Sequence, residues 1–262
     1  MTDSFAFPAL PDNGLPPGRM VKATNTAAGG REVLWVSDER QPRADVLWGR
    51  LYDQRADTGL YPLLLDVLDP FPPAGDLQNR PWHSGELGFV PVEKIDALDA
   101  EQLLRGMWPM TDDAYASDLG APSSWPGVAA PGTSGGDPGV AARKLAHDLA
   151  RKRDRLIGLV PATRGADAIA LSGWEGAVNL TNDTEELSAI VRSWEDRFDV
   201  RVVMLGFDTL YLSVAAPPTT QDHALQVAAE HLTFCPDNFD FGTFDDYAAK
   251  LIGCHNWGFW WD

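Results

Sequence analysis

Residues 183–214 read Asp183-Thr-Glu-Glu-Leu-Ser-Ala-Ile-Val-Arg-Ser-Trp-Glu-Asp-Arg-Phe-Asp-Val-Arg-Val-Val-Met-Leu-Gly-Phe-Asp-Thr-Leu-Tyr-Leu-Ser-Val214 and carry the clearest structural signals of the chain. Their first part has the spacing of a capping box at 183–186, followed by an apolar helical stripe made of Leu187, Ile190, Val191, Trp194 and Phe198. Their second part predicts strands at 201–205 and 209–214, joined by a hairpin turn at 206–208. We therefore expect a helix packed on a sheet, with Trp194 buried between them.

The sequence on either side of this unit predicts more strands and helices. Apolar runs of strand length occupy 32–37, 60–67, 156–160 and 257–262, and the last of these is expected to join the sheet. Pro62 favours the start of its strand, because proline lacks the backbone donor that a strand interior needs. Helical patterns cover 43–58, 99–108, 143–155, 166–172, 219–235 and 243–251. This mixture predicts an α+β protein.

The composition changes in the middle of the chain and predicts two lobes. Pro, Gly, Ser, Ala and Asp dominate from Pro109 to Pro138, and this stretch ends in Pro131-Gly-Thr-Ser-Gly-Gly-Asp-Pro138. Such a composition is typical of a flexible linker. We expect an N-terminal lobe at 1–110, a linker at 111–138 and a C-terminal lobe at 139–262. Each lobe would have a small sheet with helices on it.

Composition and charge limit the class of protein. Hydrophobic residues make up 44% of the 262 residues, which excludes disorder over most of the chain. The net charge is −17, so a phosphate backbone would be repelled and a nucleic-acid partner is not expected. Apolar runs such as Leu63–Leu65 are too short to cross a bilayer, and residues 1–8 lack the pattern of a secretory signal. Two cysteines are too few for a disulfide framework, so we expect a cytoplasmic location without a membrane partner.

The cysteines and histidines near the C-terminus are the strongest candidates for metal ligands. His231 and Cys235 share a helical face, and Cys254 adjoins His255, which would complete a zinc site. Adjacent residues point in divergent directions, however, and no C-x-x-C pair occurs. We expect two small buried thiols and two ordinary histidines, with no metal. The sequence also lacks a nucleophile elbow and a phosphate loop, so no catalytic residue or cofactor is assigned.

An acidic and aromatic stretch lies near the end of the sequence. Residues 199–262 contain two basic and nine acidic residues, and Phe239–Tyr247 interleaves aromatic with acidic side chains. Aromatic anchors surrounded by steering acids suit a basic protein partner. The alternative is a phenylalanine-lined core under a solvated acidic loop, which the density of aromatic residues favours. The candidate binding residues are Asp208, Asp237, Asp240, Asp245, Asp246, Phe239, Phe241 and Tyr247.

Several of these motifs carry a family resemblance. Phe207-Asp-Thr-Leu210, Phe234-Cys-Pro-Asp-Asn238 and Trp257-Gly-Phe-Trp-Trp-Asp262 resemble a bacterial domain family of unknown function that is recognised by its FD-x-L element. The resemblance is strong over 156–262. The N-terminal half, with Leu15-Pro-Pro-Gly18, resembles the leader half of longer members. The family implies no catalytic residues, and its association with toxin–immunity neighbourhoods implies a binding protein.

Two functions follow from these observations. The first is a cytoplasmic protein-binding module of the immunity or antitoxin kind, which presents an acidic aromatic face to a basic partner. The second is an enzyme or a small-ligand-binding protein with a site between the two lobes. A broad acidic and aromatic patch would favour the first, and a cleft of converging Asp, His and Trp side chains would favour the second. The oligomeric state is left open.

Overall fold

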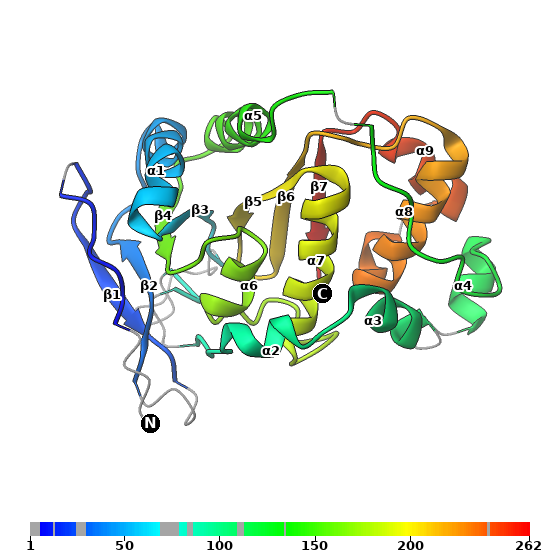
Figure 1. The fold of residues 1–262 in the computed structure, drawn as a ribbon, viewed down its shortest axis with the longest axis horizontal. Helices are drawn as coiled ribbons and strands as arrows, with labels where there is room; N and C mark the ends of the chain where they lie inside the picture. The colour runs from blue at the N-terminus through cyan, green and yellow to red at the C-terminus, as the bar shows by residue number, and fades with distance from the viewer. Residues whose placement is uncertain are drawn as a thin grey trace.

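The computed structural model describes residues 6–12, 14–24, 30–68, 79–82, 86–108, 113–133, 135–239 and 242–262, without the side chains of 113–115. Within them, seven strands form one mixed sheet in the order β1-β2-β4-β3-β5-β6-β7 (Figure 1). The strands are β1 (Gly18–Lys22), β2 (Glu32–Ser37), β3 (Tyr61–Leu65), β4 (Leu156–Val160), β5 (Val200–Leu205), β6 (Thr209–Val214) and β7 (Asn256–Trp260). Neighbouring strands are antiparallel except β3 and β5, which are parallel.

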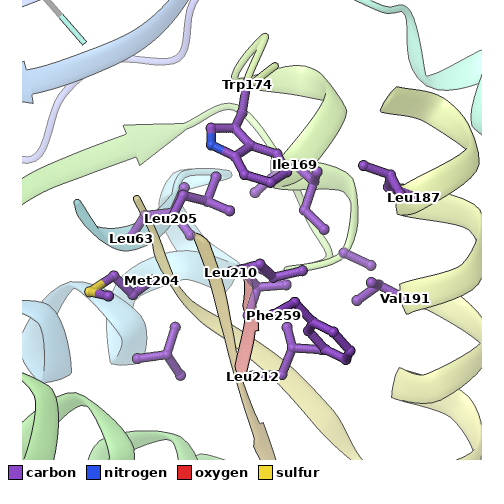
Figure 2. Packing of buried hydrophobic residues seen from close by; sticks show 14 of the residues in the cluster. Leu63, Ile169, Trp174, Leu187, Val191, Met204, Leu205, Leu210, Leu212 and Phe259 are labelled. Carbon is purple, nitrogen blue, oxygen red and sulfur yellow. The ribbon is translucent and has the colours of Figure 1, made fainter. Parts of the chain in front are cut away.

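Helices cover both faces of this sheet. They are α1 (Ala44–Thr58), α2 (Val92–Asp96), α3 (Ala100–Met107), α4 (Asp113–Leu119), α5 (Pro138–Ala150), α6 (Asp167–Leu171), α7 (Thr184–Phe198), α8 (Gln221–Phe234) and α9 (Phe244–Leu251). Helices α1 and α5 contact each other and the strands on one side, and α7 with α6 contacts the other side (Figures 1 and 2). Helix α8 packs on α9 and on the 3-10 turn η4 (Pro236–Phe239), which lies beside β7. The predicted α+β class is confirmed.

The core between α7 and the sheet follows the apolar stripe of the sequence. All five stripe residues are buried, and Trp194 is fully inaccessible, as predicted. Figure 2 shows Leu187 and Val191 facing Leu210 and Phe259 from the sheet. The hairpin and the helix that the sequence predicts at 183–214 are therefore confirmed together with their contact.

The prediction of two small sheets is wrong. Strand β4, from the C-terminal half, lies between β2 and β3 and pairs with both. Strand β3 also pairs with β5 through Leu64 and Leu65. Strands from the two halves are thus interleaved. Each half alone would leave unpaired edges next to apolar faces, which a shared sheet removes.

Pro62 lies near the start of β3, as predicted, although β3 is a central strand. Pro62 pairs with Leu159 of β4, whereas β5 pairs with β3 only at Leu64 and Leu65. The carbonyl oxygen of Pro62 accepts a hydrogen bond from Trp48 Nε1 at 2.9 Å. Proline lacks a backbone N–H, but no hydrogen bond between strands is lost, because β3 has only one partner strand at this position.

Part of the expected linker is held against the fold. The Ala129 N–H donates to Glu230 Oε1 at 2.7 Å, and the Ala129 carbonyl accepts from Arg197 Nη1 at 2.8 Å. Gly132 N donates to the Arg197 carbonyl at 2.8 Å, and the rings of Trp108 and Trp125 lie 5.6 Å apart. Glu230 is fully buried and forms two further bonds with Arg197, so this ion pair ties residues 129–132 to α7 and α8.

Candidate functional site

The turn between β5 and β6 forms one side of the candidate site. Gly206 N donates to the Thr209 carbonyl at 2.7 Å, which closes the predicted hairpin. The Gly206 carbonyl accepts from Trp174 Nε1 at 2.8 Å, and the Asp208 carbonyl accepts from Trp261 N at 3.1 Å. Two tryptophans that are distant in sequence therefore fix the position of Asp208.

Two glycines allow the loops to approach at this place. A Cβ atom on Gly206 would lie 2.1 Å from Thr209 Oγ1. A Cβ atom on Gly176 would lie 2.1 Å from the Trp174 ring and 2.6 Å from the Phe207 carbonyl oxygen. Real Cβ atoms do not come so close to backbone or to a fixed ring, so position 176 requires glycine, whereas a side chain at position 206 would force the Thr209 hydroxyl to move. The tight packing brings the loop at 174–179 next to the hairpin turn.

These loops enclose a pocket of about 330 Å³. It opens beyond the carboxyl end of β5, where Phe207 and Asp208 follow the strand. The lining residues are Arg80, Pro81, Glu86, Glu175, Gly176, Val178, Asn179, Phe207, Asp208, Trp261 and Asp262. We call this the acidic pocket, because four of the lining side chains are carboxylates and one is a guanidinium.

The single guanidinium of the acidic pocket is already neutralised. Arg80 Nε donates to both oxygens of Glu86, at 2.9 and 2.8 Å, and the Arg80 guanidinium lies over the Phe207 ring at 5.1 Å. Among the described residues, Glu175, Asp208 and Asp262 form no salt bridge. The pocket therefore has an excess of negative charge.

The electrostatic effect of this excess is visible at Glu175. Its pKa is raised above the ordinary value, first by partial burial and then by the charge of Glu86. A raised carboxyl pKa means that the surroundings disfavour a further negative charge. Burial disfavours a charge of either sign, so it is only the contribution of Glu86 that favours a positively charged ligand group.

The neighbouring Asp66, at the end of β3, is different because its charge is compensated. Burial opposes its ionisation, but the hydrogen bond from Arg153 and the charge of Arg155 outweigh burial, so the pKa of Asp66 is lowered. Its carbonyl also accepts from Trp82 Nε1 at 2.6 Å. Asp66 is thus a structural carboxylate.

Trp260 and Trp261 give the pocket an aromatic border. Trp261 is 2% exposed and forms part of the wall, whereas Trp260 is 39% exposed. Trp260 Nε1 donates to Asp208 Oδ2 at 3.2 Å. An exposed tryptophan thus stands beside the carboxylate that the sequence predicts as a binding residue.

The other predicted aspartates have separate positions. Asp237 Oδ2 accepts from Asp262 N at 3.0 Å, so Asp237 adjoins the acidic pocket. Asp246 belongs to the capping box of α9 with Thr243, and Asp245 is exposed on the first turn of that helix. Asp240 and Phe241 lie outside the described residues. The structure therefore brings Asp208 and Asp237 together with the pocket, and gives Asp246 a capping role.

The predicted aromatic residues belong largely to the interior. Phe239 is 3% exposed, and its ring centre lies 4.0 Å from that of Tyr247. Tyr247 hydroxyl bonds to His231 Nδ1 at 3.0 Å and accepts from Asn238 Nδ2 at 3.2 Å. Phe239 is therefore a core residue in this conformation and not an exposed anchor, because η4 turns its ring towards α9.

Five polar residues of the pocket are absent from the sequence-based set, namely Arg80, Glu86, Glu175, Asn179 and Asp262. Arg80, Glu86 and Glu175 come from segments without motif or periodicity, and they meet Asp208 only through the fold. No local signal marks them.

The four candidate zinc ligands make separate interactions. The Cys235 thiol donates to the Trp260 carbonyl at 3.0 Å, and burial raises the pKa of that thiol to about 12. The Cys254 thiol donates to the Asn256 carbonyl at 2.9 Å, and His255 Nδ1 lies 2.8 Å from the Val214 carbonyl. Over the residues that the structure describes, no group of three or more His, Cys, Asp or Glu side chains is arranged to hold a metal ion.

The comparisons with known proteins concern the C-terminal part of the chain. Comparison with curated proteins and with solved structures gave no match. None of the helices in the described ranges is both long and apolar enough to cross a membrane. Residues 156–262, which include β4 to β7 and the Asp208 side of the acidic pocket, match the model of a family described as a domain of unknown function (DUF4253).

Proposed function

We propose that the chain is a protein-binding module whose acidic pocket receives a basic side chain of a partner protein. The observation that carries this proposal is the excess of carboxylates in the pocket once Arg80 is paired with Glu86. An arginine or lysine side chain is complementary to such a pocket, because its cation meets the carboxylates while its hydrocarbon part packs on Phe207 and Trp261. Trp260 at the border adds an exposed aromatic contact of the kind that dominates interface energies.

The charge of the whole chain supports the same proposal. A net charge of −17 attracts a basic protein over a distance and accelerates its association. This suits a role of the immunity or antitoxin kind, in which an acidic surface covers a basic target. We place the module in the cytoplasm, and the two free cysteines support a compartment that keeps thiols reduced.

We also infer that the N-terminal half belongs to the same functional unit as residues 156–262. Its support is the pairing of β3 with both β4 and β5, which makes one sheet from the two halves.

A second candidate function, the binding of a small ligand, is favoured by a different pocket at the opposite end of the parallel pair β3 and β5.

A capped arginine-rich peptide and its citrulline analogue test the acidic pocket directly. Citrulline has nearly the shape of arginine but carries no charge. We expect the arginine peptide to bind, to shift the indole N–H resonance of Trp260 and to lose affinity as salt is added. The pair of substitutions Glu175→Gln and Asp208→Asn should weaken binding about tenfold, because two charge-assisted contacts are lost.

A matched variant separates the pocket from the general charge of the protein. Asp118→Asn combined with Asp222→Asn removes the same charge from exposed positions on α4 and α8. This variant should bind the peptide as the parent does. Equal binding of the citrulline peptide, or equal weakening by both double variants, would contradict the proposal.

A further inference from the structure

A second pocket lies at the amino ends of β3 and β5 and differs from the acidic pocket in its charge. It has a volume of about 430 Å³ and is mostly polar. Its lining residues are Arg55, Tyr61, Thr163, Arg164, Gly165, Glu195, Asp196, Asp199 and Arg201. Three guanidinium groups meet here, although the chain has 21 Lys and Arg residues against 38 acids. We call this the arginine pocket.

One of the three arginines is fully engaged. Arg164 Nε donates to Glu195 Oε2 at 2.8 Å, and Arg164 Nη2 donates to Asp196 Oδ1 at 2.7 Å. Glu195 also accepts from the Ala166 N–H at 3.0 Å, and its side chain is almost inaccessible. These contacts form a fixed wall, and they use up the carboxylate of Glu195.

The other two arginines have no carboxylate partner within the described part of the chain. Arg55 Nη1 donates to the Tyr52 carbonyl at 2.5 Å, and Arg201 Nη1 donates to the Val200 carbonyl at 2.6 Å. A guanidinium has five N–H donors, so most donors of both groups are unused by the protein. Both residues are half-buried. The Arg55 guanidinium lies over the Tyr52 ring at 3.8 Å, and the charge of Arg201 acts on Glu195, but neither group forms an ion pair with a carboxylate of the described residues.

We propose that the arginine pocket binds a small molecule through an oxyanion group, a phosphate or a carboxylate, held between Arg55 and Arg201. Guanidinium groups bind such oxyanions through paired, charge-assisted hydrogen bonds. Two features leave room for the oxyanion. The Tyr61 side chain is 1% exposed, because its hydroxyl is turned inward to the Val202 carbonyl, and position 165 is a glycine, which has no side chain. A Cβ atom on Gly165 would lie 2.5 Å from the Tyr61 hydroxyl and 3.1 Å from Glu195 Oε1, so a larger residue would displace the wall.

Substitution of Asp199 distinguishes oxyanion binding from a purely structural role of the arginines. It lines the same pocket in a left-handed backbone conformation, with φ 52°, at the end of α7. Asparagine tolerates this conformation, so Asp199→Asn removes a negative charge with little strain. If an oxyanion enters the pocket, this substitution should strengthen its binding.

Inorganic phosphate is the probe. We expect it to raise the melting temperature of the whole protein more than chloride does at equal ionic strength, as ligand binding to the folded state requires. Each of Arg55→Gln and Arg201→Gln should weaken phosphate binding about tenfold, and Asp199→Asn should tighten it several-fold. Arg105→Gln, on the exposed face of α3, is the matched control and should change nothing.

Each melting shift is referred to the same variant without phosphate, so a loss of basal stability does not obscure the result. The proposal is overturned if phosphate and chloride act alike on the parent protein. It is also overturned if Arg55→Gln and Arg201→Gln keep the phosphate effect, or if Asp199→Asn weakens it. None of these outcomes bears on the acidic pocket, which lies at the other end of the strands.

Discussion

Trp194 combines packing and hydrogen bonding at one buried position. Its ring is stacked on Phe259 with centres 5.5 Å apart, and its Nε1 donates to Glu230 Oε2 at 2.7 Å. Glu230 is in turn the partner of Arg197 and of the Ala129 N–H. Removing the indole would therefore open a cavity and also leave a buried carboxylate with one donor fewer.

We expect Trp194→Ala to lower the free energy of unfolding by about 3–5 kcal/mol, as for other large core side chains. Urea denaturation followed by circular dichroism measures this. Trp260→Ala is the control, because Trp260 is 39% exposed and should cost much less. Equal costs for the two substitutions would show that the α7 stripe does not support the core as described.

His231 gives the molecule a pH-dependent stability at the residue scale. It is fully buried, its Nδ1 bonds to the Tyr247 hydroxyl, and its Nε2 has no partner in the described residues. The ring lies edge-to-face against Trp257 at 4.6 Å. Burial lowers the pKa of His231 to about 3, from an ordinary value of 6.5.

The sign of the effect follows from these two pKa values. Between pH 6.5 and about 3 the unfolded chain binds the proton and the folded protein does not, so stability falls as the pH falls. One such group contributes a slope of up to about 1.4 kcal/mol per pH unit. We expect His231→Gln, measured by denaturant unfolding from pH 7 to pH 4, to lose less stability over that range than the parent. Parallel curves for the two proteins would exclude a neutral buried His231.

At the scale of the element, β7 shows how a sheet edge is closed by side chains. Asn238 Nδ2 donates to the Gly258 carbonyl at 2.9 Å, and Asn238 Oδ1 accepts from Trp260 N at 3.3 Å. The Cys235 thiol donates a hydrogen bond to the Trp260 carbonyl. These bonds use backbone groups through which an edge strand would pair with another chain. Recognition by strand addition is therefore disfavoured at β7, and the acidic pocket beside it is the better candidate for a partner.

Elements with a local signal could be predicted from the sequence. The stripe of α7 and the helical pattern at 243–251 depend on residues within a few turns, and both are confirmed, the first as a buried face and the second as α9. The structure adds a capping box at the start of α9, made by Thr243 and Asp246. The capping box expected at Asp183 is wrong. The Asp183 side chain makes no capping bond, and its N–H is taken by Thr181 Oγ1 at 3.0 Å. The hydrogen bond to Thr181 competes with the capping interaction, so the residue spacing of a capping box is present but its hydrogen bonds do not form.

At the scale of the whole molecule, the order of the strands could not be predicted. The sequence identifies the runs that become β2, β3 and β4, but it contains no local signal that β4 pairs between the other two. The acidic pocket has the same origin, because Arg80, Glu175 and Asp208 are distant in sequence. Of these three residues, only Asp208 lies in a motif, the hairpin turn, and it is the one that the sequence predicts as a binding residue.

The interleaved sheet leads to an expectation about cleavage of the chain. Gly135 and Gly136 are exposed, whereas Gly132 is tied to the Arg197 carbonyl, so a protease should cut first between 133 and 137. The cut protein should nevertheless stay in one piece in native buffer. Separation would break the pairing of β4 with β2 and β3, as well as that of β3 with β5.

Size-exclusion chromatography with light scattering, compared with a denaturing gel, measures both the site of the first cut and the association of the fragments. Two fragments on the gel that elute together at the intact mass, and apart only in urea, are the expected result. Fragments that separate without denaturant would show that the two halves are independent lobes. A first cut outside 112–138 would show instead that the contacts of Ala129 and Trp125 hold the whole segment closed.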